Sequence, residues 1–333
     1  MRCVTDKIVI IGVGVVGSAT GNGLIRKGYD VVFVDKNPKV IGNLKENGYR
    51  AYLQGELGSH GIIANTSMFC VDTPLSSQSS NNENGIDLGN ISSAVSTHAK
   101  YLREIKENSK NNGSRFYHLI VIRSTVPPGT TRGILLPLIE KHSGLKAGED
   151  FGLCMQPEFL RTVSAEDDFL HPRATVIGQY DSFSGDSLEK IYSSFEGEKF
   201  RVSLDVAEFM KLIHNSFNAT KISFSNEMWL LGQNIGLDVN MALQLAAKTA
   251  EGLWNPSYGL IGGQPYGGHC LPKDTQGFER FAQENKAHTP ILSAVISVNK
   301  QMEEMAKQKK VCGATLERPD SLLKEQILSE QTV

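Results

Sequence analysis

One short stretch of this sequence, Tyr266–Asp274 (YGGHCLPKD), combines the residue types that nucleophilic chemistry needs. Cys270 follows a pair of glycines, and Lys273 and Asp274 come close behind it. Glycine backbone lets a thiol approach a bound molecule closely, and a nearby ammonium group stabilises a thiolate. The pattern therefore predicts a nucleophilic cysteine. A cysteine that is simply packed in a turn is the alternative, because most free cysteines are unreactive core residues.

A second pair of polar residues, Lys211 and Asn215, stands four positions apart in KLIHN. If this segment is helical, both side chains project from the same face. An ammonium and an amide aimed at one point make two donors for a developing oxyanion. From the spacing alone, a solvated lysine and a surface asparagine are the more ordinary interpretation.

A glycine motif near the N-terminus, G-V-G-V-V-G, has the context of a dinucleotide-binding turn. It follows the apolar run Lys7–Ile11, precedes a helical segment, and is followed about twenty residues later by Asp35. In such a turn Gly12 permits the tight bend, Gly14 lets backbone amides approach a pyrophosphate, and Gly17 lets the helix pack against the strand. The helix N-terminus adds partial positive charge.

The acidic residue after the second strand predicts the cofactor. Asp35 can bond the ribose hydroxyls and repels a 2′-phosphate, so NAD is favoured over NADP, although the neighbouring Lys36 weakens that preference slightly. A turn that binds nothing, or one that binds FAD, is the alternative. The residues predicted to contact NAD here are Gly12, Gly14, Val15, Val16, Gly17, Asp35 and Lys36.

Five stretches together carry a family resemblance. They are CVDTP (Cys70–Pro74), RSTVPPGTT (Arg123–Thr131), QPEFLR (Gln156–Arg161), KLIHN (Lys211–Asn215) and YGGHCLPKD (Tyr266–Asp274). In this order they resemble the UDP-glucose/GDP-mannose dehydrogenase family, from about residue 6 to about residue 300. That family oxidises the primary alcohol of a nucleotide sugar to a uronic acid.

The resemblance implies a reaction that fits the residues. Oxidation of an alcohol to an acid takes two hydride transfers to two NAD molecules, and a cysteine retains the reactive aldehyde as a thiohemiacetal that becomes a thioester. Lys211 and Asn215 then stabilise oxyanions, Thr125 and Glu158 organise a proton-accepting water, and Asp274 positions the lysine and a water. The implied catalytic residues are Cys270, Lys211, Asn215, Asp274, Glu158 and Thr125.

The same resemblance adds residues to the predicted NAD site and predicts a site for the substrate. It adds Thr73, Thr125 and Lys273 to the NAD contacts. The residues that it implies for the nucleotide-sugar substrate are Glu158, Phe159, Leu160, Arg161, Lys211, Asn215, Tyr266, Gly267 and Gly268. No metal site is expected. His269 lies next to Cys270, but adjacent side chains rarely converge, so no Cys/His dyad is predicted.

Three departures from the family pattern bear on the substrate. Thr162 stands where the family has a second glutamate, and the segment between Ala246 and Cys270 has no arginine, with Trp254 near the expected position. The family also carries a further α/β domain after the helical one, for which this sequence offers no counterpart. A shortened segment between residues 49 and 65 adds to the divergence. The identity of the sugar is therefore left open.

The elements that must hold these residues follow from periodicity. Short apolar runs alternate with amphipathic stretches, which predicts an α/β fold: a Rossmann-like, doubly wound parallel sheet, then a long helix and an all-α domain. Residues 205–234, with an Asp205/Glu208 capping box, predict the long helix, and residues 240–250 a further one. The predicted domains are 1–202 (NAD-binding), 203–300 (helical, catalytic and dimerising) and a charged tail, 301–333. Predicted strands are Lys7–Ile11, Asp30–Val34, Ser67–Val71, His118–Arg123, Phe151–Met155 and Ala174–Gly178.

The composition limits the partners and the cellular compartment that can be expected for this protein. The 333 residues carry a formal net charge of -2, which gives no basic field for nucleic acid, and the five scattered cysteines fit a reducing compartment. No apolar run is long enough to span a membrane. A cytoplasmic protein without membrane or nucleic-acid partners is expected, and the apolar stripe of the long helix predicts a homodimer. Polar segments at 75–85 and 108–115 are expected to be exposed connections.

Two other functions stay open at this point. A single-oxidation enzyme of the β-hydroxyacid dehydrogenase kind also joins a Rossmann domain to a helical domain and uses a helix lysine and asparagine, but it does not require Cys270. A non-catalytic or partner-dependent NAD-binding subunit is the third reading.

Overall fold

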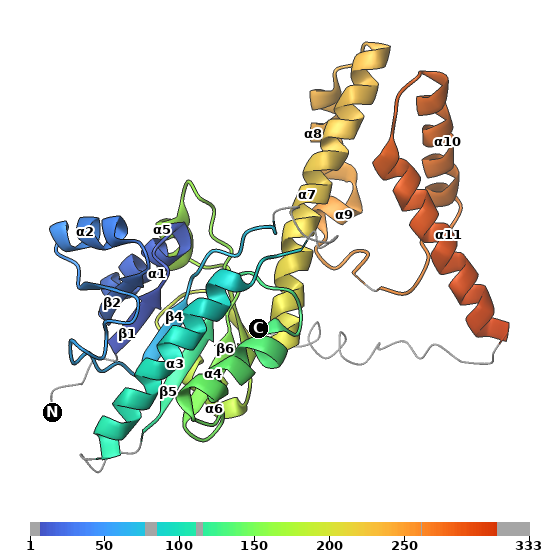
Figure 1. Ribbon diagram of the computed structural model, residues 1–333. Coiled ribbons are helices and arrows are strands. Elements are labelled where there is room, and N and C mark those ends of the chain that lie inside the picture. The colour runs from blue at the N-terminus through green and yellow to red at the C-terminus, as the bar shows by residue number, and fades with distance from the viewer. Residues whose placement is uncertain (1–6, 77–84, 111–115, 261, 312–333) are drawn as a thin grey trace, which may run out of the picture. The chain divides into compact units, whose positions relative to one another are not determined.

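The computed structural model describes residues 7–76, 85–110, 116–260 and 262–311. The chain divides into two compact units, Met1–Ser216 and Phe217–Val333 (Figure 1). The predicted domain limits at 202 and 300 stay predictions. Parts of the polar connections expected at 75–85 and 108–115 lie outside the described residues, as do Cys3, Cys312 and the tail after residue 311. Where the second connection is described, residues 108–110 belong to a helix.

Unit 1 is built on an eight-stranded sheet in its described part, in the order β3-β2-β1-β4-β5-β6-β7-β8. All six predicted strands are present, with ends that differ by at most two residues, and β3 and β8 are additional. The strands are β1 (Lys7–Ile11), β2 (Asp30–Asp35), β3 (Ala51–Leu53), β4 (Thr66–Phe69), β5 (His118–Ile122), β6 (Phe151–Met155), β7 (Ala174–Gln179) and β8 (Glu198–Ser203). The first six follow the order of a dinucleotide-binding sheet.

One strand pair departs from the predicted parallel arrangement. β6 and β7 are antiparallel, with Cys154 opposite Gln179 and Met155 opposite Gly178, whereas β7 and β8 are parallel again. The predicted parallel sheet is confirmed as the main arrangement, and this pair is the exception to it among the described strands. As a consequence, the segment that leaves β6 continues toward the beginning of β7, where an all-parallel sheet would have separated them.

Apolar side chains cover both faces of the sheet, which is why the strands consist of unbroken apolar runs. Val9 and Val32 pack on one face with residues of α3, while Ile8 and Phe33 pack on the other face with residues of α1 and α6. Helices therefore lie on both sides of the sheet, and the doubly wound fold is confirmed (Figure 1).

Two helices of unit 1, α2 and α6, begin at side-chain caps. Asn37 accepts a hydrogen bond from the Lys39 N–H at the start of α2, and Asp181 caps α6 through the Ser184 N–H. The helical segments are α1 (Val15–Arg26), α2 (Pro38–Glu46), α3 (Gly89–Lys110), the π-helical turn η1 (Thr131–Leu135), α4 (Leu136–Ser143), α5 (Ala165–Leu170) and α6 (Ser182–Ile191).

The long helix α7 (Leu204–Ile235) is present as predicted and runs from unit 1 into unit 2. Its expected capping box is not formed. Ser203 Oγ accepts from the Val206 N–H instead, while the buried Glu208 carboxylate accepts from the N–H groups of Gly129 and Thr131. The carboxylate thus holds a loop of another element, which the short D-x-x-E pattern could not reveal.

Unit 2 is helical in its described part. Its helices after α7 are α8 (Val239–Thr249), α9 (Glu251–Trp254), α10 (Cys270–Glu284) and α11 (Pro290–Val311). α8 matches the helix predicted at 240–250, whereas α11 continues through the position where a charged tail was expected to begin. None of the helices that the structure describes combines the length and the apolar character needed to cross a membrane.

Candidate functional site

The glycine turn between β1 and α1 has the geometry that the sequence predicts. Gly12 has φ +86°, and a Cβ there would lie 2.9 Å from the carbonyl oxygen of Cys70. A Cβ on Gly17 would overlap the carbonyl oxygen of Gly12, so helix and strand can approach only without a side chain. Around Gly14, in contrast, there is open space, and no side chain caps the first turn of α1. An uncapped helix N-terminus beside open space fits a pyrophosphate.

Asp35 is fixed at the end of β2 by two backbone donors. Its Oδ2 accepts from the Val13 N–H at 2.7 Å and its Oδ1 from the Asn37 N–H at 2.8 Å. Lys36 turns away to donate to Asn90 Oδ1 at 2.7 Å. Because this contact directs the ammonium of Lys36 toward α3, Asp35 faces the turn without a competing cation.

These residues line a cleft of about 670 Å³, called here the cofactor cleft. Among the predicted NAD contacts, those that line it are Gly12, Gly14, Val15, Val16, Asp35, Lys36, Thr73 and Thr125. Gly17 acts in packing instead, and Lys273 lies in unit 2. The sequence missed Asn90, Ser93 and Arg123, which also line this cleft. The sequence signals for Arg123 are its place at the start of the RSTVPPGTT motif and its position directly after the apolar strand HLIVI.

The two loops at the carboxyl ends of β4 and β5 are joined by side-chain hydrogen bonds. Thr73 Oγ1 donates to the Thr125 carbonyl oxygen at 2.7 Å, and Ser124 Oγ donates to the Val71 carbonyl oxygen at 2.6 Å. Both loops are therefore held against each other where the cofactor cleft borders on Glu158. Thr125 is half-buried at this border.

Glu158 and Lys211 form an almost buried ion pair. Lys211 Nζ lies 3.0 Å from Glu158 Oε1 and also donates to the Glu158 carbonyl oxygen, and the two side chains are 6% and 13% exposed. The second carboxylate oxygen accepts from the Leu160 N–H at 2.7 Å. Such a pair in a low dielectric is held in one geometry. The structure thus brings together two predicted catalytic residues from separate elements.

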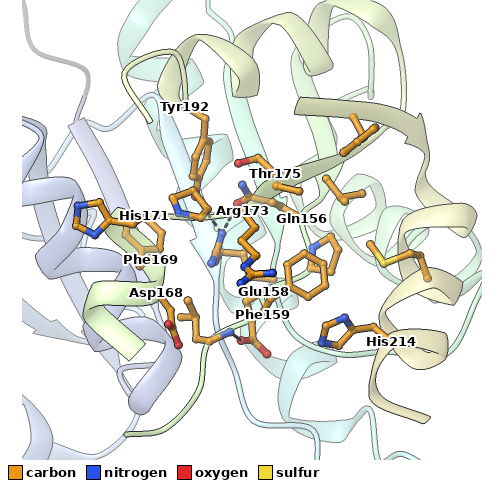
Figure 2. A pocket seen from close by; sticks show the side chains of 18 of the residues that line it. Gln156, Glu158, Phe159, Asp168, Phe169, His171, Arg173, Thr175, Tyr192 and His214 are labelled. Carbon is orange, nitrogen blue, oxygen red and sulfur yellow. Dashed lines mark hydrogen bonds between the residues drawn. The ribbon is translucent and has the colours of Figure 1, made fainter. Parts of the chain in front are cut away.

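The other substrate residues predicted in unit 1 differ in how many contacts hold their side chains. Phe159 packs its ring against Lys211 Nζ, 5.4 Å from the ring centre, and against the His214 ring (Figure 2). Arg161 donates to Asp168 through Nε and Nη2. Asn215 is exposed, one turn beyond Lys211 on α7. Burial, with the nearby Lys211 charge, lowers the pKa of His214.

A buried arginine lies near the Glu158–Lys211 pair. Arg123 is 4% exposed and donates through Nη1 to Gln156 Oε1 and, at 3.0 Å, to Tyr192 Oη. Burial raises the pKa of the neighbouring Cys70 thiol, although the Arg123 charge opposes that rise. Cys70 therefore stays a neutral thiol at neutral pH.

The cysteine motif lies in unit 2. Cys270 is exposed and is the first residue of α10. Gly268, with φ +80°, makes the turn before it, and no side chain caps the helix. Lys273 Nζ lies 2.5 Å from Asp274 Oδ1, and both side chains are exposed. The free N–H groups of the first turn are thus next to the sulfur.

Tyr266 is anchored by residues that the sequence did not indicate. Its N–H donates to Asn299 Oδ1 at 2.7 Å, and its hydroxyl lies 3.4 Å from Thr275 Oγ1. Asn299, on α11, is 7% exposed and is held in turn by Glu303 Oε1. The segment before the cysteine is therefore fixed from α11. The motif itself gave no hint of this, because Asn299 comes 33 residues later.

Comparison with known proteins agrees with this arrangement. Residues 6–196 match the NAD-binding domain, and residues 205–301 the central domain, of the UDP-glucose/GDP-mannose dehydrogenase family. The chain belongs to this family. The resemblance inferred from the five motifs is therefore confirmed, and so is NAD as the cofactor of the first domain. The predicted site residues lie in these motifs, in both units. The role of each of these residues remains a proposal.

Two curated dehydrogenases show the extent of the similarity. The chain is 32% identical over 311 residues to GDP-mannose 6-dehydrogenase of Pseudomonas savastanoi pv. phaseolicola, covering 88% of this chain and 68% of that protein. It is 33% identical over 315 residues to the putative UDP-glucose 6-dehydrogenase YtcA of Bacillus subtilis (strain 168), covering 88% and 67%.

Solved structures give the same result. GDP-mannose dehydrogenase from Pseudomonas aeruginosa, in a ternary complex, superposes with a TM-score of 0.80 at 28% identity, covering 92% of this chain and 71% of that one. UDP-glucose dehydrogenase from Pyrobaculum islandicum gives 0.64 at 27% identity, with coverage of 94% and 73%.

Proposed function

We propose that this dehydrogenase oxidises the primary alcohol of a nucleotide sugar to the carboxylic acid, with NAD⁺ as oxidant and Cys270 as covalent nucleophile. The observation that carries the proposal is the Glu158–Lys211 pair at the edge of the cofactor cleft, in a chain of this family. Relatives named for GDP-mannose and for UDP-glucose make these two sugars the first candidates.

In the first oxidation, the residues of unit 1 handle the proton. Glu158 takes the hydroxyl proton, directly or through a water held by Thr125, because both line the cofactor cleft. Bound NAD⁺ would accept one hydride from the substrate carbon in each oxidation step. Lys211, whose ammonium already contacts Glu158, donates to the alcohol oxygen as it gains negative charge.

In the second oxidation, Cys270 holds the carbon. Its sulfur bonds to the aldehyde carbon, giving a thiohemiacetal whose oxygen receives hydrogen bonds from Lys211 and Asn215. Loss of the second hydride gives the thioester, and water then breaks the C–S bond, which frees the thiol. One alcohol, two NAD⁺ and one water are converted to one carboxylate, two NADH and three protons. The N-terminus of α10 lies where the sulfur carries negative charge.

Stoichiometry tests this proposal directly. UDP- and GDP-sugars are incubated with NAD⁺, and NADH is followed by absorbance while the sugar product is identified by mass. Two NADH per sugar and no free aldehyde are expected. Cys270→Ser should stop thioester turnover, whereas the exposed Cys270 thiol should be labelled by an alkylating reagent unless substrate protects it. One NADH per sugar, undiminished in Cys270→Ala, would favour the single-oxidation enzyme, and NAD binding without turnover would favour a non-catalytic subunit.

We also propose that the chain forms a homodimer through α7. Phe209, Ile213, Phe217 and Phe224 are 56%, 51%, 62% and 41% exposed and recur at helical spacing along this helix. The apolar stripe that the sequence predicts is therefore not covered by the described part of the same chain. A second copy would bury it, since exposed apolar patches of this kind commonly mark interaction surfaces.

A further inference from the structure

A buried asparagine of α11 contacts the segment that precedes Cys270. Asn299 is 7% exposed, and it continues the buried row of Leu292 and Ile296 on the same face of the helix. Asparagine is mostly found at protein surfaces, because its amide loses hydrogen bonds to water when it is buried. An amide in an apolar row must therefore form hydrogen bonds inside the protein, and its partners indicate its role.

The hydrogen bonds of Asn299 use both ends of its amide. Its Oδ1 accepts from the Tyr266 N–H at 2.7 Å, and its Nδ2 donates to Glu303 Oε1 at 3.1 Å, one turn further along α11. A carboxylate only accepts hydrogen bonds, so Glu303 keeps the amide nitrogen on its own side and the amide oxygen toward Tyr266. The helix that carries Asn299 thus sets the direction of its bond to the tyrosine.

The same tyrosine is also held by α10. Thr275 Oγ1 donates its single proton to the Leu271 carbonyl oxygen at 2.8 Å, so the Tyr266 hydroxyl, 3.4 Å away, donates to the threonine oxygen. Tyr266 is therefore fixed at its backbone by α11 and at its hydroxyl by α10, whose first residue is Cys270. Residues 266–275 form a closed loop that contains the cysteine.

Two glycines and a histidine separate the anchored tyrosine from the cysteine. Apart from atoms of adjacent residues, nothing lies within 4 Å of the place where a Cβ of Gly267 or Gly268 would stand, and Gly268 has φ +80°. Glycine backbone without neighbouring contacts can adopt many conformations. The position of Cys270 relative to α11 therefore depends on the anchor at Tyr266, because packing around the glycines does not fix it.

Helix α11 is itself fixed at its start. Glu227 of α7, which is 5% exposed, accepts from the N–H groups of Ile291 and Leu292 at 2.7 and 3.0 Å. In the next residue, Ser293 Oγ donates to Glu279 Oε1 of α10 at 2.5 Å. α11 is thus tied to two other helices, and it passes this support to the segment before the cysteine.

We propose that Asn299 is a positioning residue for the Cys270 nucleophile and acts through the Tyr266 N–H. This inference rests on the proposed function, in which Cys270 attacks the aldehyde after the first oxidation. Such an attack needs the sulfur close to the reacting carbon and correctly oriented. Asn299 takes no part in the chemistry. By holding Tyr266 it restricts the glycine pair and keeps the sulfur where the aldehyde forms.

The two oxidations make this role measurable, because only the second one needs the cysteine. Asn299→Leu removes the acceptor and extends the apolar row, so the variant should fold. Its first oxidation, in which one alcohol and one NAD⁺ give one aldehyde, one NADH and one proton, should keep its single-turnover rate. Capture of the aldehyde should fail in most turnovers. The yield should therefore fall from two NADH per sugar toward one, and a hydrazine reagent should trap the aldehyde for identification by mass.

Two further variants separate positioning from general damage. Gln301→Leu, which changes an exposed residue of the same helix, is the matched control and should give two NADH per sugar. Asn299→Asp brings a second carboxylate against Glu303 and should lower the yield. Asn299→Asp combined with Glu303→Gln restores both hydrogen bonds and should recover it. A merely structural role of Asn299 would slow both oxidations together and release no aldehyde.

Hydrogen exchange followed by mass spectrometry tests the anchor without turnover. In Asn299→Leu the amides of residues 266–271 should exchange about tenfold faster because one hydrogen bond is lost, while those of α8 should keep their rates. Unchanged exchange in this segment, or two NADH per sugar and no aldehyde from Asn299→Leu, would overturn the inference while the proposed function stands. One NADH per sugar from the unaltered protein would overturn the proposed function, and this inference with it.

Discussion

Lys211 Nζ and Glu158 Oε1, 3.0 Å apart, join helix α7 to the segment that leaves β6. The lysine is 6% exposed at its side chain and the glutamate 13%, so each charge depends on the other for its solvation. The same ammonium also donates to the carbonyl oxygen of Glu158. This pair therefore serves the stability of unit 1 as well as the proposed proton transfer.

Glu158→Gln should lower the free energy of unfolding by about 3 kcal/mol, because it leaves a buried ammonium without its counter-charge. Lys211→Met should cost a similar amount. The double variant should lose clearly less than the sum, since no unpaired charge remains. Urea unfolding of the unaltered protein, the two single variants and the double variant measures the coupling free energy between the two side chains. Strictly additive losses would show that the pair is not energetically linked. In turnover, both single variants should be nearly inactive.

Alanine at two glycines of the same turn should have opposite consequences. Gly17→Ala places a methyl group into the Gly12 carbonyl oxygen and should destabilise the fold by about 1–3 kcal/mol. Gly14→Ala meets open space and a backbone φ of −80°, so the chain should fold normally. It should nevertheless bind NAD⁺ about tenfold more weakly, because the methyl group occupies the space of the pyrophosphate. Thermal melts and NAD⁺ titrations check both; normal NAD⁺ affinity in Gly14→Ala would contradict the assignment of the turn.

A buried chain of three side chains links β4, β5 and α3. His118 Nδ1 lies 3.0 Å from the Ala64 carbonyl oxygen and must donate to it, so His118 Nε2 accepts from the Ser67 hydroxyl. Ser67 oxygen then accepts from His98 Nε2 at 2.7 Å. This arrangement requires the His118 ring to be neutral, because its Nε2 accepts a hydrogen bond. Burial lowers the pKa of His98 well below its usual value and that of His118 to about 4.

Acid should therefore destabilise unit 1. Both folded-state pKa values lie below the unfolded value of about 6.5, so the unfolded chain binds protons first. The stability contributed by the neutral rings is complete above about pH 6.5 and is lost as the pH falls toward 4. Between pH 7.5 and 5, His118 alone should account for a loss of about 2 kcal/mol. Tyr101, whose pKa burial raises to about 12, stays neutral throughout.

Urea unfolding at several pH values measures this loss. His118→Gln removes one titrating ring and should flatten the pH dependence, even though its stability at neutral pH is lower. The carboxylates of the chain contribute equally in both proteins. The difference between the two slopes of unfolding free energy against pH therefore isolates the contribution of His118. Equal slopes in the two proteins would contradict the prediction.

The apolar stripe of α7 offers a test of the proposed dimer. Phe217→Glu places a charge in its middle and should shift the protein from dimer to monomer in light scattering coupled to gel filtration. Phe183→Glu, a change at a 56% exposed phenylalanine of α6, is the matched control and should leave the mass unchanged. A monomeric mass for the unaltered protein would disprove the dimer.

The sequence predicted those parts of the fold in which local pattern and burial agree. β1, β2 and β5 are apolar runs buried on both faces, and such runs are read directly. β3 was missed because it has only three residues, and β8 because its six residues, EKFRVS, are half exposed at the edge of the sheet. The direction of β7 depends on tertiary packing, which periodicity does not encode.

The candidate site shows the same division. The glycine turn and Asp35 were predictable because their chemistry is encoded in local spacing. The contact between Lys211 and Glu158 joins residues 53 positions apart, and only the family resemblance placed them in one reaction. Asn90 and Ser93, which line the cofactor cleft, had no sequence signal, because their role depends on where α3 lies beside the glycine turn.

Glu208 and Lys211 stand one helical turn apart on α7. Glu208 accepts hydrogen bonds from the backbone of Gly129 and Thr131, in the loop that follows Thr125 along the chain, and Lys211 pairs with Glu158. The first turns of α7 therefore hold both the loop that follows Thr125 and the carboxylate of Glu158, so a rotation of these turns would displace two segments that carry residues proposed to handle the proton. A substitution that tilts the start of α7 would therefore shift both of these segments, and a compensating change would be needed in each.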